Sequence, residues 1–192
     1  MNESVIQNIQ ERVITSIKAH NSVGIQVPEG RHDDLLESII GCMQSNPQDQ
    51  WTILACHNTY ETYINNHPQL LECPHLHFID CISRYSGITQ PNTTAVTYID
   101  SPTMLEHLLL SMISTFKNND PNAERFFFID SLSALTLHNN TELITKFTAL
   151  MLNRARNEHI HVASVIIEEE THGNNLLQLN DKIIVLRDSF IG

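Results

Sequence analysis

Basic residues are scarce in this sequence, and charged residues of either sign are few. Only 17% of the 192 residues are charged, and 11 Lys and Arg stand against 22 Asp and Glu, so the formal net charge is −11. A surface of that sign repels phosphate backbones and anionic lipids, so binding to nucleic acid or to an acidic membrane is not expected. Arg154 and Arg156 lie close together, and we expect them at a solvated helix end, where the helix dipole favours cations.

Long apolar runs are also missing. No stretch approaches the ~20 consecutive apolar residues that span a bilayer, and the first 13 residues (MNESVIQNIQERV) lack the cationic and apolar blocks of a secretory signal. We therefore expect a soluble, cytoplasmic protein whose four cysteines are reduced. The 41% of hydrophobic residues suffices for a core, which excludes wholesale disorder.

One segment has alternating metal-ligand residues but not the spacing of a metal site. Cys73, His75, His77 and Cys81 would share one face of an extended strand. Such a strand separates its two cysteines by about 25 Å at ~3.3 Å per residue, which is too far for one ion. Structural zinc is normally held by tight turns. The sequence therefore predicts no metal site.

Apolar residues alternate between strand-like runs and helical spacing along the whole chain. Helices are expected over 4–19, 35–43, 60–66, 101–113 (with Pro102 at its first position) and 141–154. Strands are expected over 23–27, 51–56, 76–79, 95–99, 125–129, 162–167 and 182–186, with a loop over 86–95. Strands without polar alternation, separated by helices, indicate an α/β fold with a doubly wound, mainly parallel sheet and helices on both faces. We expect one domain over 1–192, in which a helix within 1–20 precedes the core.

Three segments together resemble a known family. Asp130-Ser131 follows four apolar residues and precedes LSAL, which resembles the Walker B segment of RecA/KaiC-like ATPases. Residues 180–186 (NDKIIVL) resemble the closing strand of that family, and residues 99–102 (IDSP) are similar to a helix start in archaeal KaiC-like proteins. The resemblance covers about residues 20–190 and implies a RecA-like fold.

The resemblance also locates a phosphate-binding loop whose chemistry is lost. In the family, this loop reads G-x-x-x-x-G-K-[ST], and its Lys and backbone N–H groups hold phosphates. Residues 27–34 (VPEGRHDD) correspond to it here, with Gly30 inside the loop. Val27 stands at the first Gly, His32 at the second, Asp33 at the Lys, and Asp34 at the hydroxyl that ligates magnesium.

The change of charge sign outweighs the lost glycines. Two unit charges ~4 Å apart interact by about 4 kcal/mol at an effective dielectric constant near 20. Asp33 therefore repels a phosphate by about the amount that Lys attracts one. Asp33 and Asp34 are also expected at a helix start, where the dipole favours anions. No cofactor is predicted.

The catalytic residues implied by the resemblance are also absent. His57 and Asn58 stand where KaiC-like enzymes carry a Glu pair that activates water, so no catalytic residue is predicted. Asp130 and Ser131 keep the Walker B position, and we interpret Asp130 as the residue that caps the turn after a buried strand.

Three functions remain open from the sequence. The first is a KaiC/RecA-like domain without ATP turnover, a pseudo-ATPase that regulates or scaffolds by binding a protein, either an active KaiC-like ATPase or a second copy. The second is a small-ligand sensor that uses the vacated pocket, with His32, Cys56, His57 and Asp130 as candidate residues. Within this second function, residual nucleotide binding in the same pocket is also open. The third is an enzyme with Cys56 as a thiol nucleophile. The helix over 4–19 is free to pack on the sheet or on a neighbouring subunit.

Overall fold

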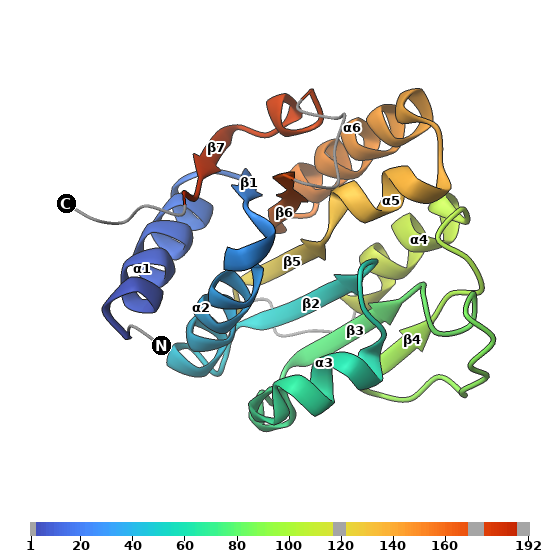
Figure 1. The fold of residues 1–192 in the computed structure, drawn as a ribbon, viewed down its shortest axis with the longest axis horizontal. Coiled ribbons are helices and arrows are strands. Elements are labelled where there is room, and N and C mark those ends of the chain that lie inside the picture. The colour runs from blue at the N-terminus through green and yellow to red at the C-terminus, as the bar shows by residue number, and fades with distance from the viewer. Residues whose placement is uncertain (1–2, 117–121, 169–174, 188–192) are drawn as a thin grey trace.

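The computed structural model describes residues 3–116, 122–168 and 175–187. Within these ranges, seven parallel strands form one sheet in the order β4-β3-β2-β5-β6-β1-β7 (Figure 1). The strands are β1 (Ser22–Val27), β2 (Gln50–Ala55), β3 (Leu76–Asp80), β4 (Val96–Tyr98), β5 (Arg125–Asp130), β6 (His161–Ile167) and β7 (Lys182–Val185). Each lies within one residue of its predicted ends, because a buried parallel strand is apolar on both faces.

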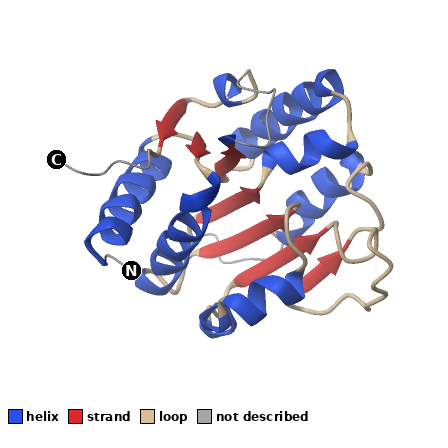
Figure 2. Ribbon diagram, in the orientation of Figure 1, coloured by secondary structure: helices blue, strands red, loops and turns tan. Residues whose placement is uncertain are grey.

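In the part of the chain that the structure describes, six α-helices cover both faces of the sheet, as Figure 2 shows. On one face lie α1 (Glu3–Ala19), α2 (His32–Ser45) and α3 (Tyr60–Asn66), and on the other lie α4 (Leu105–Thr115), α5 (Leu132–His138) and α6 (Thr141–Asn157). The two faces enclose separate apolar clusters, and successive strand residues alternate between them, as Ile53 and Leu54 do in β2. The predicted α/β class with a doubly wound parallel sheet is confirmed.

Helix α1 packs on the sheet of its own chain. Ile9, Val13 and Ile17 are buried in the same cluster as β1 and β6. At Gly41 of α2, an added Cβ would lie 2.8 Å from the side-chain oxygen of Gln10, so α1 and α2 approach closely because this position has no side chain. Of the two arrangements left open for this helix, the structure has the intramolecular one.

Two helix predictions need correction. Helix α4 begins at Leu105, and not at Ser101-Pro102. The Ser101 hydroxyl accepts from the Thr103 amide at 3.2 Å, and its carbonyl accepts from the Met104 amide at 3.1 Å, so this polar turn satisfies the backbone before the helix starts. Helix α5 was not predicted, because its seven residues are too few for a clear helical period. The sequence NNDPN at 118–122 also predicts a turn, and its residues 118–121 lie outside the described residues.

No helix in the described ranges has the length and apolar character needed to cross a membrane.

Candidate functional site

Three segments meet where parallel strands end at one edge of the sheet. The loop 28–31 follows β1, Cys56 and His57 follow β2, and Asp130 ends β5. Because β2 pairs with β5 and places Ala55 opposite Asp130, these segments share the carboxyl edge (Figure 1). Open parallel sheets bind ligands at this edge, so a binding site is expected here.

The loop after β1 is held by hydrogen bonds within the segment 28–34. Pro28 ends the strand, and Glu29–Arg31 form one 3-10 turn that leads directly into α2. The Arg31 amide donates to the Pro28 carbonyl at 2.9 Å, and the Arg31 guanidinium binds the Asp34 carboxylate at 2.7 Å. A Cβ added at Gly30 would meet no atom within 4 Å, so packing does not require a glycine there.

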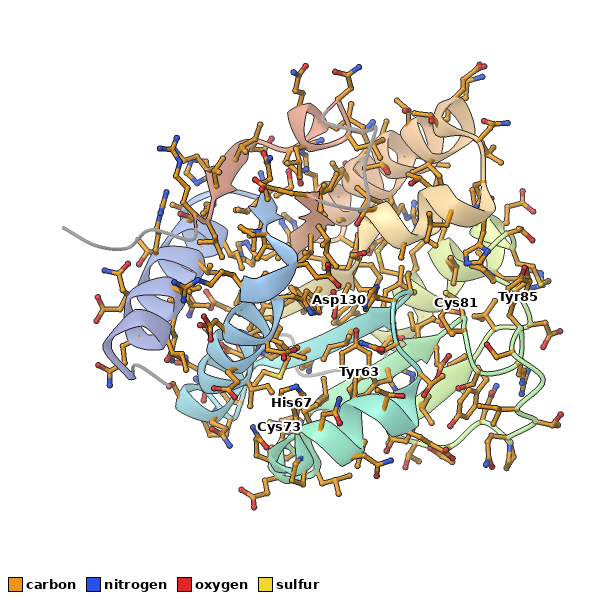
Figure 3. All side chains as sticks on the ribbon, in the orientation of Figure 1. Tyr63, His67, Cys73, Cys81, Tyr85 and Asp130 are labelled. Carbon is orange, nitrogen blue, oxygen red and sulfur yellow. The ribbon has the colours of Figure 1, made fainter. Side chains whose placement is uncertain are left out.

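His32, at the start of α2, reaches across the sheet edge to Asp130. Its Nε2 lies 2.6 Å from Oδ1 of Asp130, whose side chain is fully buried. The Tyr63 hydroxyl of α3 donates to Oδ2 of the same carboxylate, and Figure 3 labels both residues, Tyr63 at α3 and Asp130 at the end of β5. Burial and the nearby Asp130 raise the pKa of Tyr63 well above its ordinary value, so this phenol stays protonated and remains a donor. We call His32, Tyr63 and Asp130 the buried triad.

The expected role of Asp130 as a turn cap is wrong. Ser131 caps α5, since its hydroxyl accepts from the Ala134 amide at 3.1 Å. The Asp130 carboxylate instead joins α2 and α3, and its carbonyl accepts from the amides of Cys56 and His57 at 2.8 and 3.1 Å. The peptide bond between Asp130 and Ser131 is cis. Asp130 therefore links four segments of the chain.

The other predicted site residues differ in how far they are buried. The exposed His57 ring lies 5.6 Å, centroid to centroid, from the His32 ring. Asp33 is exposed, and Val27 is fully buried in the core. Asn58 lines a cavity of about 20 Å³ beside the triad, enough for one water molecule and far below the ~300 Å³ of a typical small-ligand pocket.

A second buried aspartate, Asp80, was missed by the sequence analysis. It ends β3 on the other side of β2, and Ala55 pairs with both Asp80 and Asp130. Its carboxylate accepts from the amides of Tyr60, Ile82 and Ser83 at 2.7–2.8 Å and from the Ser83 hydroxyl at 2.6 Å. Phe-Ile-Asp occurs at the end of both β3 and β5, and this repeat was the available signal. Asp80 holds the start of α3.

The thiol of Cys56 is unsuited to nucleophilic chemistry. Cys56 is buried, and desolvation followed by a hydrogen bond with Cys81 raises its pKa well above the ordinary value. The thiolate is the nucleophilic form, so a raised pKa suppresses reactivity near neutral pH. This arrangement argues against the thiol enzyme considered from the sequence.

We expect iodoacetamide at pH 8 to label native protein at the half-buried Cys73 alone. Burial raises the pKa of Cys42 to about 12, and Cys81 is fully buried. Labelling of Cys42, Cys56 and Cys81 should be roughly 100-fold slower than after unfolding in urea. Peptide mass spectrometry measures the rates, and Cys73→Ser provides the blank. Rapid labelling of Cys56 in the native protein would contradict its burial.

The alternating Cys/His segment is split by the fold. Cys73 precedes β3, the His77 ring is bonded to the Thr94 carbonyl and the Thr97 hydroxyl, and Cys81 follows the strand. Burial lowers the pKa of His77. No group of three or more His, Cys, Asp or Glu suited to a metal ion occurs in the part of the chain that the structure describes.

Solved structures share this arrangement of strands and helices. An uncharacterized protein from Pyrococcus horikoshii, solved in complex with an unknown peptide, matches with a TM-score of 0.68 and 14% identity over 88% of this chain and 78% of that one. A KaiC-like protein from Pyrococcus horikoshii OT3 matches with a TM-score of 0.54 and 9% identity, over 90% of this chain and 74% of that protein. The flagellar accessory protein FlaH from Methanocaldococcus jannaschii matches with a TM-score of 0.54 and 14% identity, over 86% of this chain and 71% of FlaH.

The fold is KaiC-like. No family model and no curated protein matches the sequence. At 9–14% identity these structures establish the RecA-like, KaiC-like architecture alone. In that architecture the buried triad lies at the carboxyl edge of the sheet.

Proposed function

We propose that this chain is a KaiC/RecA-like domain without ATP turnover, a single domain over residues 1–192 that regulates or scaffolds other proteins in the cytoplasm. Its partner would be an active KaiC-like ATPase or a second copy of the chain. In this proposal the loop at 27–34 is the former phosphate loop. Asp33 and Asp34 replace its cation and hydroxyl, and His57 and Asn58 replace the catalytic acids.

The observation that carries the proposal is the contact between His32 and Asp130. His32 occupies the position of the second loop glycine, and its ring is bonded to the carboxylate at the Walker B position, 2.6 Å away. A phosphate and its magnesium ion would have to displace this buried ring. The phosphate would also have to approach the carboxylate of Asp33, at a cost of about 4 kcal/mol for two unit charges ~4 Å apart at an effective dielectric constant near 20.

The closed site favours the scaffold over the small-ligand sensor. A sensor needs an open pocket at the same edge, whereas the cavity that the described residues form beside the triad holds about 20 Å³. The candidate residues His32, Cys56 and Asp130 are buried and bonded to groups of the protein itself. The solved neighbour that carries an unknown peptide is consistent with a role in binding polypeptides.

We expect isothermal titration with Mg-ATP and Mg-ADP to give no heat of binding at nucleotide concentrations up to the millimolar range. The physical reason is the acidic loop and the ring that fills the site. Micromolar affinity for either nucleotide would overturn the proposal.

A loop variant provides the matched control. Val27→Gly, His32→Gly, Asp33→Lys and Asp34→Ser together restore the glycines, the cation and the hydroxyl of the family pattern. We expect this variant to bind Mg-ADP more tightly than the parent does, because the substitutions remove the His32 ring from the site and reverse the charge at position 33. Circular dichroism checks that the variant is folded.

A further inference from the structure

A groove between α4 and α6, on the face of the sheet away from α1 and α2, has no role in the site above. Leu105 and Leu109 line it from α4, and Leu143, Phe147 and Leu150 line it from α6. Its volume is about 200 Å³. A drug-sized ligand needs roughly 300 Å³ or more, so the groove suits one or two side chains of a polypeptide better than a free small molecule.

The groove exposes large apolar side chains along two helices. Leu143 and Leu150 of α6 are 45% and 58% exposed, and Leu109 of α4 is half-buried. Positions 143, 147 and 150 follow helical spacing, as do 105 and 109, so each helix presents one apolar ridge. Two such ridges with a groove between them are the usual receptor for an amphipathic helix.

The charges around the groove indicate which charge a helix that binds there should have. Glu106 lines the groove with a carboxylate. Lys146 is the lining residue with a positive charge, and its ammonium is already bonded to Glu142 at 2.6 Å. With Glu142 counted, two carboxylates stand against one ammonium beside the groove, and the whole chain has a net charge of −11. At this groove, a second copy of this chain or an anionic membrane would meet charge of its own sign, whereas a basic helix would be attracted.

We propose that the α4–α6 groove binds an amphipathic helix of a partner protein, with apolar anchors between the leucines and basic residues facing Glu106. The proposal rests on the proposed scaffolding function and names the surface and the chemistry of the partner.

The test uses a fluorescein-labelled 18-residue peptide with leucines at helical spacing and lysines at the other positions, titrated with the full chain. We expect fluorescence anisotropy to report saturable binding that weakens as salt rises. A scrambled peptide of the same composition and a peptide with Glu for Lys should each bind at least about tenfold more weakly, because the first has no apolar face and the second has the wrong charge.

Variants of the protein locate the binding. Leu143→Gln with Leu150→Gln keeps helix-forming residues at exposed positions and should weaken binding about tenfold or more. Glu106→Gln should weaken it about threefold. Leu71→Gln is the matched control, since Leu71 is 65% exposed in the Pro68–Glu72 turn outside the groove, and it should change nothing.

Three results would overturn the proposal: equal binding of the scrambled peptide, unchanged binding by the double variant, or a dimer in analytical ultracentrifugation that the double variant abolishes. The last would assign the groove to a second copy. None of these measurements contains nucleotide, so failure here is distinguishable from failure of the Mg-ATP titration.

Discussion

Asp130→Ala should lower the free energy of unfolding by about 3–5 kcal/mol, because it removes the carboxylate from the centre of the buried triad. The His32 ring and the Tyr63 hydroxyl, both buried, would lose their bonds to it. In a functional site, by contrast, an acidic group kept for a metal ion usually lowers the stability of the free protein. Urea denaturation followed by circular dichroism measures the change.

The size of this loss distinguishes a structural aspartate from a ligand-binding one. Tyr63→Phe removes one of the two bonds to the carboxylate and should cost about 1–3 kcal/mol. The two effects should not add, because both variants break the same hydrogen bond. If Asp130→Ala left stability unchanged or increased it, Asp130 would be a ligand-binding group, and the proposal of a pseudo-ATPase would fail.

Asp80→Ala should have an effect of similar size, about 3–5 kcal/mol of unfolding free energy. The fully buried carboxylate accepts three backbone N–H bonds and one hydroxyl bond, and alanine accepts none. One of these amides belongs to Tyr60, the first residue of α3. We therefore expect α3 to fray first, which hydrogen exchange at residues 60–66 would report.

Ser83→Ala is the control for this second prediction. It removes the hydroxyl bond to Asp80 and leaves the three amide bonds, so it should cost only about 1 kcal/mol. A loss as large as that of Asp80→Ala would mean that the hydroxyl, and not the backbone anchoring of α3, carries the stabilisation. Because α3 also carries Tyr63, we expect Asp80→Ala to couple energetically with Tyr63→Phe.

The strands and their parallel arrangement were predictable because a strand that is buried on both faces has apolar residues at nearly every position. Phe126, Phe127, Phe128 and Ile129 form a run with no polar alternation, as a strand covered on both faces requires. Helix α5 and the start of α4 were not predictable in the same way. The first is too short to show a period, and the second depends on hydrogen bonds of Ser101 that compete with the helix.

The candidate site was predictable in its position but not in its contacts. Asp130 and His32 were singled out from the resemblance to the family pattern. Nothing in the sequence indicates that the ring of one reaches the carboxylate of the other, because they are 98 positions apart. Tyr63 has no motif of its own. It is found only when α3 is seen packed beside β2 and β3, with its hydroxyl directed at Asp130.

The strand order has a consequence for how the chain is made. The two neighbours of β1 are β6 and β7, which lie near the other end of the sequence. On the ribosome, residues 22–27 therefore emerge long before either pairing strand has been synthesised. Until β6 is made, the apolar residues that α1 and α2 bury against β1 and β6 lack part of their cover, and apolar surface left open in this way favours misassociation of a nascent chain.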